Sequence, residues 1–402
     1  MIQTGLFWGV LFAAVLVHWM LPRGLRPAFL ALSSAGYLAT LAPEVVGGLV
    51  LWITVFYLAI HAPPDEDAPP ETPRRRSFHA ALIVAILGQL AWFKYLPPMA
   101  AALGIEGLAA RTLVPLGMSF FTFKLVHYAV EVARGNVRDR NYWQFAAYMF
   151  LFPIFTAGPI ERYDHYRANQ AERLSTDDVV FGLTRIVHGL VKKLVLAEMV
   201  VRPLMKGNGG AEIIAGLDAL PSWKIGGWMA LLFLHLYLDF SAYSDIGIGA
   251  SRLFGLRIGE NFNFPFVARN INDFWKRWHM SLSGWCQAYV YLPTIGLTRN
   301  PYLAVTSTFV VMGLWHAGSL TRILWGLYHA GGIITFTQWS KWKRKKAKWL
   351  NKGFWPWLGQ PITWVFLAGS ACFLAVEDAG GEASALDALR LLAKLIGIYD
   401  LL

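Results

Sequence analysis

Histidine-bearing clusters lie between residues 235 and 330, in a part of the chain that is otherwise strongly apolar. In the first cluster His235 and Asp239 are four residues apart, which places them about 40° apart on one face of a helix. A carboxylate beside an imidazole can fix its tautomer and tune its basicity. A structural hydrogen bond between helices is the other interpretation of this pair.

The second cluster is the stretch Asn-Asp-Phe-Trp-Lys-Arg-Trp-His-Met-Ser-Leu-Ser over residues 272–283. On one continuous helix Trp275, His279 and Ser283 share a face, and the charged Arg277 lies close by. Such polarity is costly against lipid and fits a helix that lines a water-filled cavity. An amphipathic helix at the membrane surface is the alternative.

The third cluster centres on His316, which lies inside the uncharged run 300–321 and therefore at membrane depth. A neutral imidazole there could act as a base, a nucleophile or a metal ligand, although a lone buried histidine is commonly a packed core residue. His329 follows thirteen residues later, about 220° around a continuous helix. Both can face one tunnel only if Gly318 and Ser319 break the helix, so we expect one of them at the reaction centre.

Other catalytic signatures are missing from the chain. It contains no His-Glu-x-x-His, no Walker loop, no Cys-x-x-Cys and no Gly-x-Ser-x-Gly. The sequence therefore predicts no metal site, no nucleotide hydrolysis and no serine-hydrolase chemistry.

The elements that must position these residues are membrane helices. Of 402 residues, 56% are hydrophobic and only 15% are charged, against about 45–50% and about 25% in soluble domains. This composition excludes a cytosolic globular enzyme and a disordered chain. The two cysteines, Cys286 and Cys372, lie in apolar stretches and are expected to be buried thiols.

A crossing of the bilayer takes about 20 apolar residues, so we expect about ten to twelve transmembrane or re-entrant helices in an all-α polytopic protein. The expected uncharged spans are 5–21, 28–43, 45–64, 77–93, 225–238, 300–321, 323–340 and 353–376. Charge-bearing apolar segments lie near 113–133, 142–160, 179–205 and 239–256. The first span lacks a basic flank and a cleavage site, so we expect it to be retained rather than removed as a signal peptide.

The net charge of +11 is distributed between the apolar runs. Such basic clusters are typical of cytoplasmic loops in membrane proteins. The sequence has no basic face with interleaved aromatic residues, so nucleic-acid binding is not expected. Arg23 and Arg26 follow the first span, and the densest cluster lies within 341–352. Both place the N-terminus outside the cytoplasm, in a multi-pass protein. The 341–352 run is interpreted as a topology anchor, with docking of an anionic acyl donor as the alternative.

Taken together, these motifs resemble the membrane-bound O-acyltransferase (MBOAT) family, within it the bacterial alginate O-acetylation and lipoteichoic-acid D-alanylation branch. The resemblance covers roughly residues 110–335. It rests on Met-Ser-Phe-Phe-Thr-Phe-Lys at 118–124, Glu-Val-Ala-Arg-Gly at 131–135, Phe-Pro-Ile-Phe-Thr-Ala-Gly-Pro-Ile-Glu-Arg at 152–162, Tyr-Leu-Asp-Phe-Ser-Ala-Tyr-Ser-Asp at 237–245, Glu-Asn-Phe-Asn at 260–263, the stretch 273–283, Gly-Leu-Trp-His at 313–316 and Trp-Gly-Leu-Tyr-His at 325–329.

The resemblance implies a ring of tilted and re-entrant helices around a central tunnel, where a cytoplasmic thioester donor meets an acceptor from the opposite side. His316 matches the catalytic histidine of the family and His279 the second histidine position. The residues expected to line the tunnel or bind substrate are Asn261, Asp273, Trp275, Arg277, Trp278, Ser281, Ser283, Trp315 and Tyr328. Supporting positions behind them are expected at His235, Asp239, Asp245 and His329.

One departure from the family pattern bears on donor handling or partner docking. The family often carries Arg-Asp before Tyr-x-Tyr, whereas Gln287 and Ala288 precede Tyr289-Val-Tyr291 in this chain.

The expected organisation is one integral-membrane domain over 1–402, with N-terminal helices at 1–110, a catalytic core at 111–335, and a basic cytoplasmic loop and C-terminal helices at 336–402.

The leading hypothesis is an O-acyltransferase of the bacterial inner membrane that moves a short acyl group, acetyl by preference, onto a hydroxyl of an extracytoplasmic glycan, lipid or relay protein. No bound cofactor is expected. The co-substrate would be acetyl-CoA or an acyl-phosphopantetheine carrier protein, and the partners membrane lipids and an extracytoplasmic esterase-like acyl acceptor. The alternatives are D-alanyl transfer from a carrier protein, a transporter, and a non-catalytic scaffold of an export complex.

Overall fold

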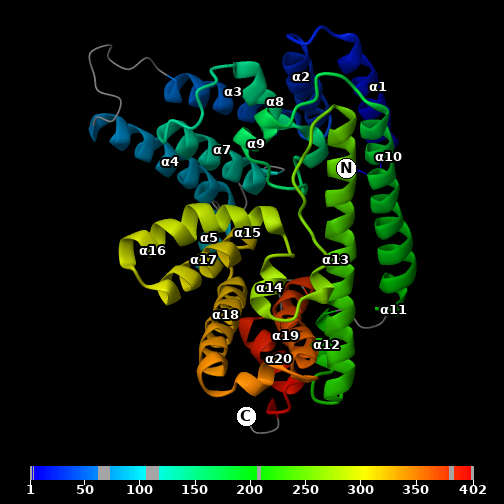
Figure 1. Ribbon diagram of the computed structural model, residues 1–402, viewed down its shortest axis with the longest axis vertical. Helices are drawn as coiled ribbons and strands as arrows, with labels where there is room; N and C mark the ends of the chain where they lie inside the picture. Colours follow the sequence, from blue (N-terminus) through cyan, green and yellow to red (C-terminus); the bar gives the residue numbers. More distant parts are fainter. Residues whose placement is uncertain are drawn as a thin grey trace. The chain divides into compact units, whose positions relative to one another are not determined.

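The computed structural model describes residues 2, 4–61, 73–105, 117–205, 210–379 and 384–399. Within these ranges the regular elements are helices, and the one β-type contact is an isolated bridge between Gln170 and Leu256 (Figure 1). The all-α class expected from the composition is confirmed. Both cysteines are buried free thiols, also as expected.

Four helical stretches of the described chain are long and apolar enough to cross a bilayer: Pro43–Ile60, Ser77–Lys94, Ser222–Leu253 and Trp355–Glu377. A shorter apolar helix is formed by Gly5–Met20. The segments expected separately at 225–238 and 239–256 are one helix of 32 residues, because nothing in the sequence breaks the helix between them. Asp239, which suggested a boundary, is instead paired with a lysine.

The chain divides into two compact units. The first comprises Met1–His188 and Tyr243–Gly259. Its helices are α1 (Gly5–Met20), α2 (Arg26–Ala39), α3 (Pro43–Ile60), α4 (Pro73–Lys94), α5 (Leu96–Ala102), α7 (Met118–Ala133), α8 (Tyr142–Phe150), α9 (Tyr163–Ala168) and most of α10 (Thr176–Leu190). Local signals fix their starts: the Thr4 hydroxyl accepts the N–H of Phe7 at the start of α1, and Asn141 caps α8 in the same way.

The second unit comprises Gly189–Ala242 and Glu260–Leu402 and contains the histidine clusters. After the π-helical segment Val191–Val201 come α11 (Arg202–Leu204), α12 (Gly210–Ala215), the first part of α13 (Ser222–Leu253), α14 (Ile271–Trp275), α15 (Met280–Cys286), the π-helical segment Gln287–Tyr291, α16 (Leu292–Thr298), α17 (Pro301–His316), α18 (Leu320–Lys346), α19 (Gly359–Asp378) and α20 (Ala385–Leu395). The Gln287-Ala288 departure from the family pattern thus begins a π-helical segment.

Helices α17 and α18 form a tight hairpin. A β-carbon on Gly313 would lie 2.2 Å from the carbonyl oxygen of Arg322, and one on Gly326 would lie 2.3 Å from that of Phe309. Both positions therefore require glycine for the two backbones to approach this closely. The chain turns at 317–319, where Ser319 accepts the N–H of Arg322 and starts α18.

The stretch 272–283 is not one continuous helix. α14 ends at Trp275, and α15 begins after His279, whose backbone has φ 42° and ψ 53°. This left-handed conformation is incompatible with a continuing helix. The shared face expected for Trp275, His279 and Ser283 is therefore wrong, because the backbone turns at His279 before it reaches Ser283.

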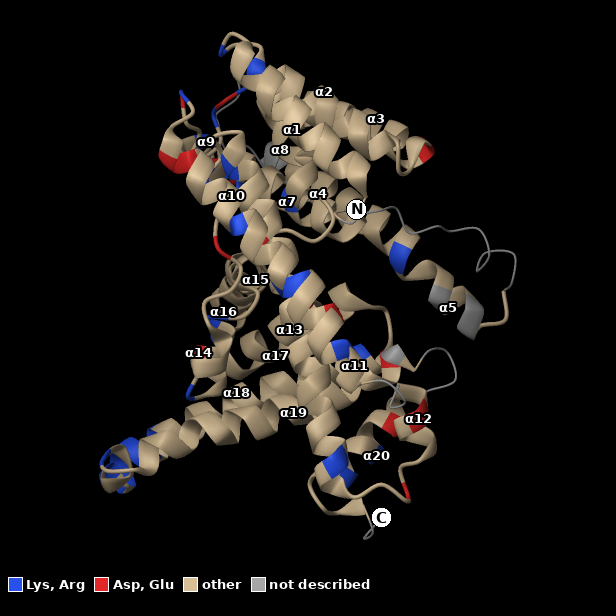
Figure 2. Cartoon of the chain, turned by 90° about the vertical axis from the view of Figure 1, so that its right-hand side faces the viewer, with Lys and Arg blue, Asp and Glu red and all other residues tan. Residues whose placement is uncertain are grey.

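Basic residues gather at the end of α18 (Figure 2). Its last turn holds Lys343, Arg344, Lys345 and Lys346. Arg344, Lys345 and Lys346 are exposed. The basic cluster that was interpreted as a topology anchor thus begins within the last turn of a long helix.

Candidate active site

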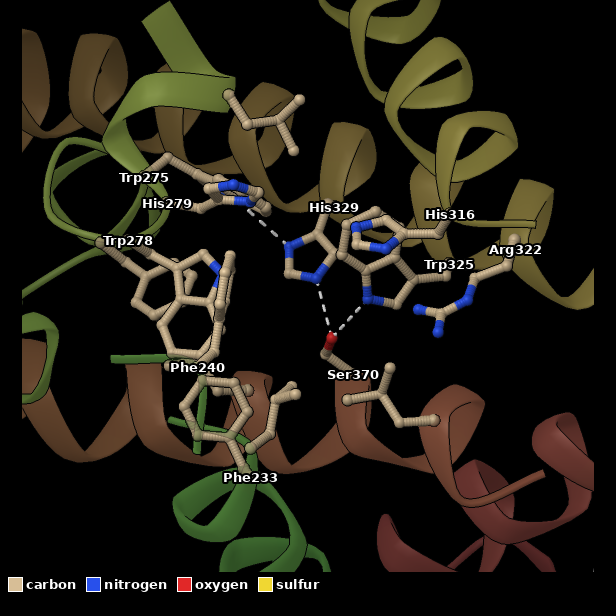
Figure 3. A pocket seen from close by; sticks show the side chains of 15 residues that line it. Phe233, Phe240, Trp275, Trp278, His279, His316, Arg322, Trp325, His329 and Ser370 are labelled. Carbon is tan, nitrogen blue, oxygen red and sulfur yellow. Dashed lines mark hydrogen bonds between the residues drawn. The ribbon is translucent and has the colours of Figure 1, made fainter. Parts of the chain in front are cut away.

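A cavity of about 70 Å³ lies within the second unit (Figure 3). Helices α13, α14, α15, α17, α18 and α19 and the 276–279 turn all contribute to its wall. Its lining residues are Phe233, Leu236, Phe240, Phe274, Trp275, Trp278, His279, Leu282, His316, Arg322, Trp325, His329, Leu367, Ser370 and Leu374. The wall is thus mainly aromatic and aliphatic, with three imidazoles, one guanidinium, one hydroxyl and no carboxylate.

The tight hairpin brings His316 and His329 to the same cavity. The sequence allowed both histidines to face one cavity only if the helix between them breaks. It does break at 317–319, and the two residues lie on different helices. His316 is the last residue of α17, and its side chain is exposed. Its ring lies 4.5 Å from that of Trp315 and 5.5 Å from that of Trp325, in edge-to-face geometry in both cases.

His329 is held from both sides of its ring. Its Nδ1 accepts the indole N–H of Trp275 at 3.3 Å, and its Nε2 lies 2.8 Å from the hydroxyl of Ser370 (Figure 3). That hydroxyl also accepts the indole N–H of Trp325 at 2.9 Å. A histidine with both nitrogens engaged is fixed in place and in tautomer. His329 is therefore suited to positioning, and His316 is the better placed of the two to meet a reactant.

His279 presents a buried nitrogen to the same cavity. Its side chain is only 2% exposed, and its Nε2 has no hydrogen-bond partner among the described residues. A buried polar nitrogen without a partner is costly unless a ligand supplies one. A non-glycine residue in the left-handed region stores strain, which is often found at functional sites. His279 can accept or donate one hydrogen bond to a molecule in the cavity.

The segment 261–263 holds the turn at His279. The carbonyl oxygen of Asn261 accepts the N–H of Met280 at 2.9 Å, and its side-chain oxygen accepts the hydroxyl of Ser281 at 2.9 Å and the N–H of the same residue at 3.4 Å. The N–H of Asn263 donates to the carbonyl of Arg277 at 2.9 Å. Asn261, which is fully buried, therefore supports His279 from behind and does not line the cavity.

Two tryptophans that were expected at the tunnel do line the cavity. Trp275 meets His329, as described above. Trp278 stacks on Phe233 with ring centroids 5.0 Å apart and on Phe274 at 5.5 Å. Stacked aromatic walls exclude water and strengthen electrostatic interactions inside the cavity.

The remaining expected tunnel residues do not line the cavity. Asp273 and Arg277 form an ion pair at 2.9 Å, one turn apart. The hydroxyl of Ser283 donates to the carbonyl of Trp278 at 3.3 Å. The Tyr328 hydroxyl donates to the carbonyl of Phe366 at 2.9 Å. Trp315 is buried between the His279 and His316 rings, 5.9 Å and 4.5 Å away.

His235 and Asp239, which one interpretation of their spacing paired, do not bond one another. Asp239 forms an ion pair with Lys193, which also binds Glu198 at 3.0 Å. The buried Nε2 of His235 has no partner among the described residues. Asp245 belongs to the first unit, where it pairs with Arg185 at 2.6 Å. The four-residue spacing put His235 and Asp239 on one face, but a neighbouring cation attracts the carboxylate more strongly than an imidazole does.

Ser370 and Arg322 line the cavity and were not expected from the sequence. Ser370 is one of two hydroxyl residues, with Thr363, in the apolar span 353–376, and a serine in such a span carries no signal. Arg322 is the only charge between the uncharged runs 300–321 and 323–340, and that isolation could have singled it out. Its guanidinium forms a two-pronged ion pair with Glu377, so a cation at the cavity wall is held by a carboxylate behind it.

No group of three or more His, Cys, Asp and Glu side chains in the described chain lies close enough to hold a metal ion. The groups that face the cavity are suited to proton transfer and hydrogen bonding. An imidazole in such a site can take a proton from a hydroxyl and return it to a leaving group.

Comparison with known proteins gives consistent results. The chain is 34% identical to a probable alginate O-acetylase of Azotobacter vinelandii over 258 residues, which cover 60% of this chain and 50% of that protein. It is 31% identical to a teichoic acid D-alanyltransferase of Bacillus subtilis (strain 168) over 258 residues, 60% of this chain and 63% of that one. It is 28% identical to a peptidoglycan O-acetyltransferase of Helicobacter pylori over 268 residues, 58% and 49% of the two chains. The chain thus spans about half the length of the two O-acetyl relatives.

The sequence model of the MBOAT, membrane-bound O-acyltransferase family, matches residues 87–374. This region contains all three histidines of the cavity and the helices that carry them. The protein, a helical membrane protein with several apolar spans, belongs to the membrane-bound O-acyltransferase family.

Proposed function

We propose that this protein is an O-acyltransferase that moves an acetyl group from a cytoplasmic thioester to a hydroxyl on an extracytoplasmic acceptor. The observation that supports it is the cavity of the second unit, where three imidazoles line a mainly apolar wall that carries one guanidinium, one hydroxyl and no carboxylate. Family membership supplies the reaction class. The cavity chemistry supplies the argument for the acyl group.

The size of the cavity argues against a long acyl chain, and its charge favours acetyl over D-alanyl. A volume of about 70 Å³ suits a few heavy atoms rather than a long acyl chain. A D-alanyl group carries an ammonium, which would enter a wall whose only permanent charge is the cation of Arg322. An ammonium buried without a counter-charge costs several kcal/mol. A neutral acetyl group meets no such penalty.

The proposed step uses the histidines in different roles. His316 takes the proton of the acceptor hydroxyl while the oxygen attacks the thioester carbonyl. The carbon–oxygen bond forms, the carbon–sulfur bond breaks, and His316 returns the proton to the departing thiolate. Transfer through an acyl-histidine is the covalent variant of the same step. His279, in the tautomer that carries its proton on Nε2, donates to the carbonyl oxygen or orients the attacking group.

The two sides of the membrane supply the two substrates. Basic residues at the end of α18 mark the cytoplasmic side, where acetyl-CoA or an acyl carrier protein would dock. The relatives are named for alginate, teichoic acid and peptidoglycan, which are cell-envelope or secreted polymers. The acceptor is therefore proposed to be a hydroxyl of such a glycan, or of a lipid or esterase-like relay protein that carries the acyl group to it. The protein would reside in the inner membrane with its N-terminus outside the cytoplasm.

The test uses the purified full-length protein in proteoliposomes with two donors on one phosphopantetheine carrier, acetyl and D-alanyl, and a polyol acceptor. Covalent ester is measured by mass spectrometry. We expect acetyl ester, with kcat/KM for acetyl at least about 100-fold above that for D-alanyl. A preference for D-alanyl would contradict the acetyl assignment. Acyl groups that cross the bilayer without forming an ester would indicate a transporter, and no acyl movement with either donor a scaffold.

A further inference from the structure

A second cavity, of about 320 Å³, lies within the first unit. Residues at the end of α1, at the start of α2 and in the segment that follows α9 contribute to its lining. Polar and basic groups dominate this wall, in contrast to the apolar cavity of the second unit. They are His18, Arg23, Arg26, Gln144, Arg167, Gln170 and Glu172.

Arg26 is a cation without a carboxylate partner among the residues that the structure describes. Its guanidinium donates to the carbonyl oxygens of Leu21 at 3.1 Å and of Glu172 at 3.0 Å. It also lies over the ring of Trp19, 4.6 Å from the centroid. These contacts hold the guanidinium in place and leave its charge unneutralised at the cavity wall.

The other two guanidiniums are paired at the rim. Arg23 bonds the carboxylate of Glu172 at 2.8 Å, and both side chains are more than half exposed. Arg167 bonds Asp139 at 2.7 Å and the amide oxygen of Gln170 at 3.1 Å. An exposed ion pair such as Arg23–Glu172 is weak and opens easily. A stronger anion can therefore displace Glu172 from Arg23.

His18 supplies a second, independent observation. Its side chain is only 6% exposed and it lines the cavity. Its Nδ1 is buried and has no hydrogen-bond partner in the described chain. The neighbouring rings of Trp19 and Phe254, 5.2 Å and 5.5 Å away, offer it no acceptor. A polar ligand in the cavity would supply the hydrogen-bond partner that this buried imidazole nitrogen lacks.

We propose that this cavity binds a phosphate group, with Arg26 and Arg23 as its main ligands and His18 as a further hydrogen-bond partner. Planar guanidiniums recognise phosphate oxygens through paired N–H groups. Gln144 and Gln170 use one N–H each to bond one another, which leaves a second N–H on each amide for the ligand. Glu172 pairs with Arg23 when the site is empty and competes with an incoming phosphate for it.

The surroundings of the cavity favour a phospholipid headgroup as the source of the phosphate. α1 is an apolar helix whose side chains Leu16 and Met20 are 68% and 83% exposed, as is typical of a helix that faces lipid. Arg23 and Arg26 follow its end within one to two turns, and basic side chains that close an apolar helix are suited to meet lipid headgroups. A soluble phosphate compound offers the same chemistry, and the experiment separates the two sources.

The experiment measures binding to the purified full-length protein in an uncharged detergent by isothermal titration. The probes are dihexanoyl phosphatidylglycerol, dihexanoylglycerol, which lacks the phosphate, and inorganic phosphate at matched ionic strength. Arg26→Gln and Arg23→Gln are each expected to weaken binding of the phosphate-bearing probe about tenfold. Arg173→Gln, an exposed neighbour that does not line the cavity, is the matched control. Glu172→Gln is expected to tighten binding by up to about fivefold, because it removes the competing carboxylate.

The exposed Arg23 and Glu172 variants keep the test valid if Arg26→Gln fails to fold. Phosphatidylglycerol that binds at least tenfold more tightly than inorganic phosphate supports a lipid, and equal affinities support a soluble phosphate. Equal binding of dihexanoylglycerol and phosphatidylglycerol would overturn the proposal. So would no binding by either phosphate probe, or Arg23 and Arg26 variants that bind like Arg173→Gln.

Discussion

At Ser370 a single hydroxyl organises one side of the apolar cavity. It accepts the indole N–H of Trp325 and bonds Nε2 of His329, and it is the only polar group that α19 contributes to the wall. Removal of this hydroxyl leaves an indole N–H and an imidazole nitrogen without that partner in a dry site, at a cost of about 1–3 kcal/mol each. The orientation of His329 and Trp325 therefore depends on one oxygen atom.

Ser370→Ala is predicted to lower kcat for acyl transfer about tenfold while KM changes little, because the positions of the rings around the reactants change and the donor still binds. Steady-state kinetics with the purified protein measure both constants. Ser307→Ala is the matched control, since the Ser307 hydroxyl bonds Thr294 on α16 and the carbonyl of Ala304 and does not line the cavity. A rise in KM alone would show that Ser370 contacts the donor instead.

The joint between α14 and α15 sets the position of His279. The helix must stop at Trp275 and restart at Met280, and Asn261 accepts hydrogen bonds from the first two residues of the new helix. Asn261→Ala removes the side-chain acceptor of two of these bonds.

We predict that Asn261→Ala reduces acyl transfer and lowers the apparent melting temperature, because the left-handed turn at His279 loses its support. Thermal unfolding followed by fluorescence, together with kcat, reports both effects. Asn263→Ala is the control: the side chain of Asn263 is exposed, and its described bonds use the backbone. Equal effects of the two substitutions would rule out this supporting role.

The hairpin of α17 and α18 places His316 beside Trp325. Gly326→Ala puts a methyl group 2.3 Å from a backbone oxygen, so the helices must separate. We predict a lower melting temperature and a loss of transfer activity in this variant. Gly331→Ala on the same helix meets nothing within 4 Å and is predicted to leave both unchanged or to raise stability slightly. If Gly326→Ala behaves like Gly331→Ala, close packing of the hairpin is not what holds His316.

The sequence predicted the helical class and brought attention to His279, His316 and His329, which all line the cavity. Polar residues in apolar runs can be recognised from the sequence as functional candidates, because their burial in a membrane is energetically costly. The break at His279 was not visible, since a histidine carries no signal for a left-handed backbone. Ser370 was not visible either, because its role arises from a contact across 41 residues of chain. Helical spacing alone could not show that Asp239 turns to Lys193.

At the scale of the whole molecule, the distribution of the net charge of +11 predicts the orientation of the chain in the membrane. Both native cysteines are buried, which leaves the wild type as a blank for thiol labelling. We predict that Lys345→Cys is labelled by a membrane-impermeant maleimide in inside-out vesicles and not in intact cells. Leu41→Cys, between α2 and α3 and 40% exposed, is predicted to show the opposite pattern. Reversal of the two patterns would place the N-terminus in the cytoplasm.

The central claim is that the cavity of the second unit transfers an acyl group through His316. The most direct measurement is single-turnover transfer of labelled acetyl from its thioester by the purified protein, for the wild type, His316→Ala and His188→Ala. His188 is exposed and does not line the cavity, so it matches the change of residue without touching the site. We predict that His316→Ala is slower by about 100-fold or more, with an unchanged elution profile, while His188→Ala behaves as the wild type. Transfer by His316→Ala at the rate of His188→Ala would contradict it.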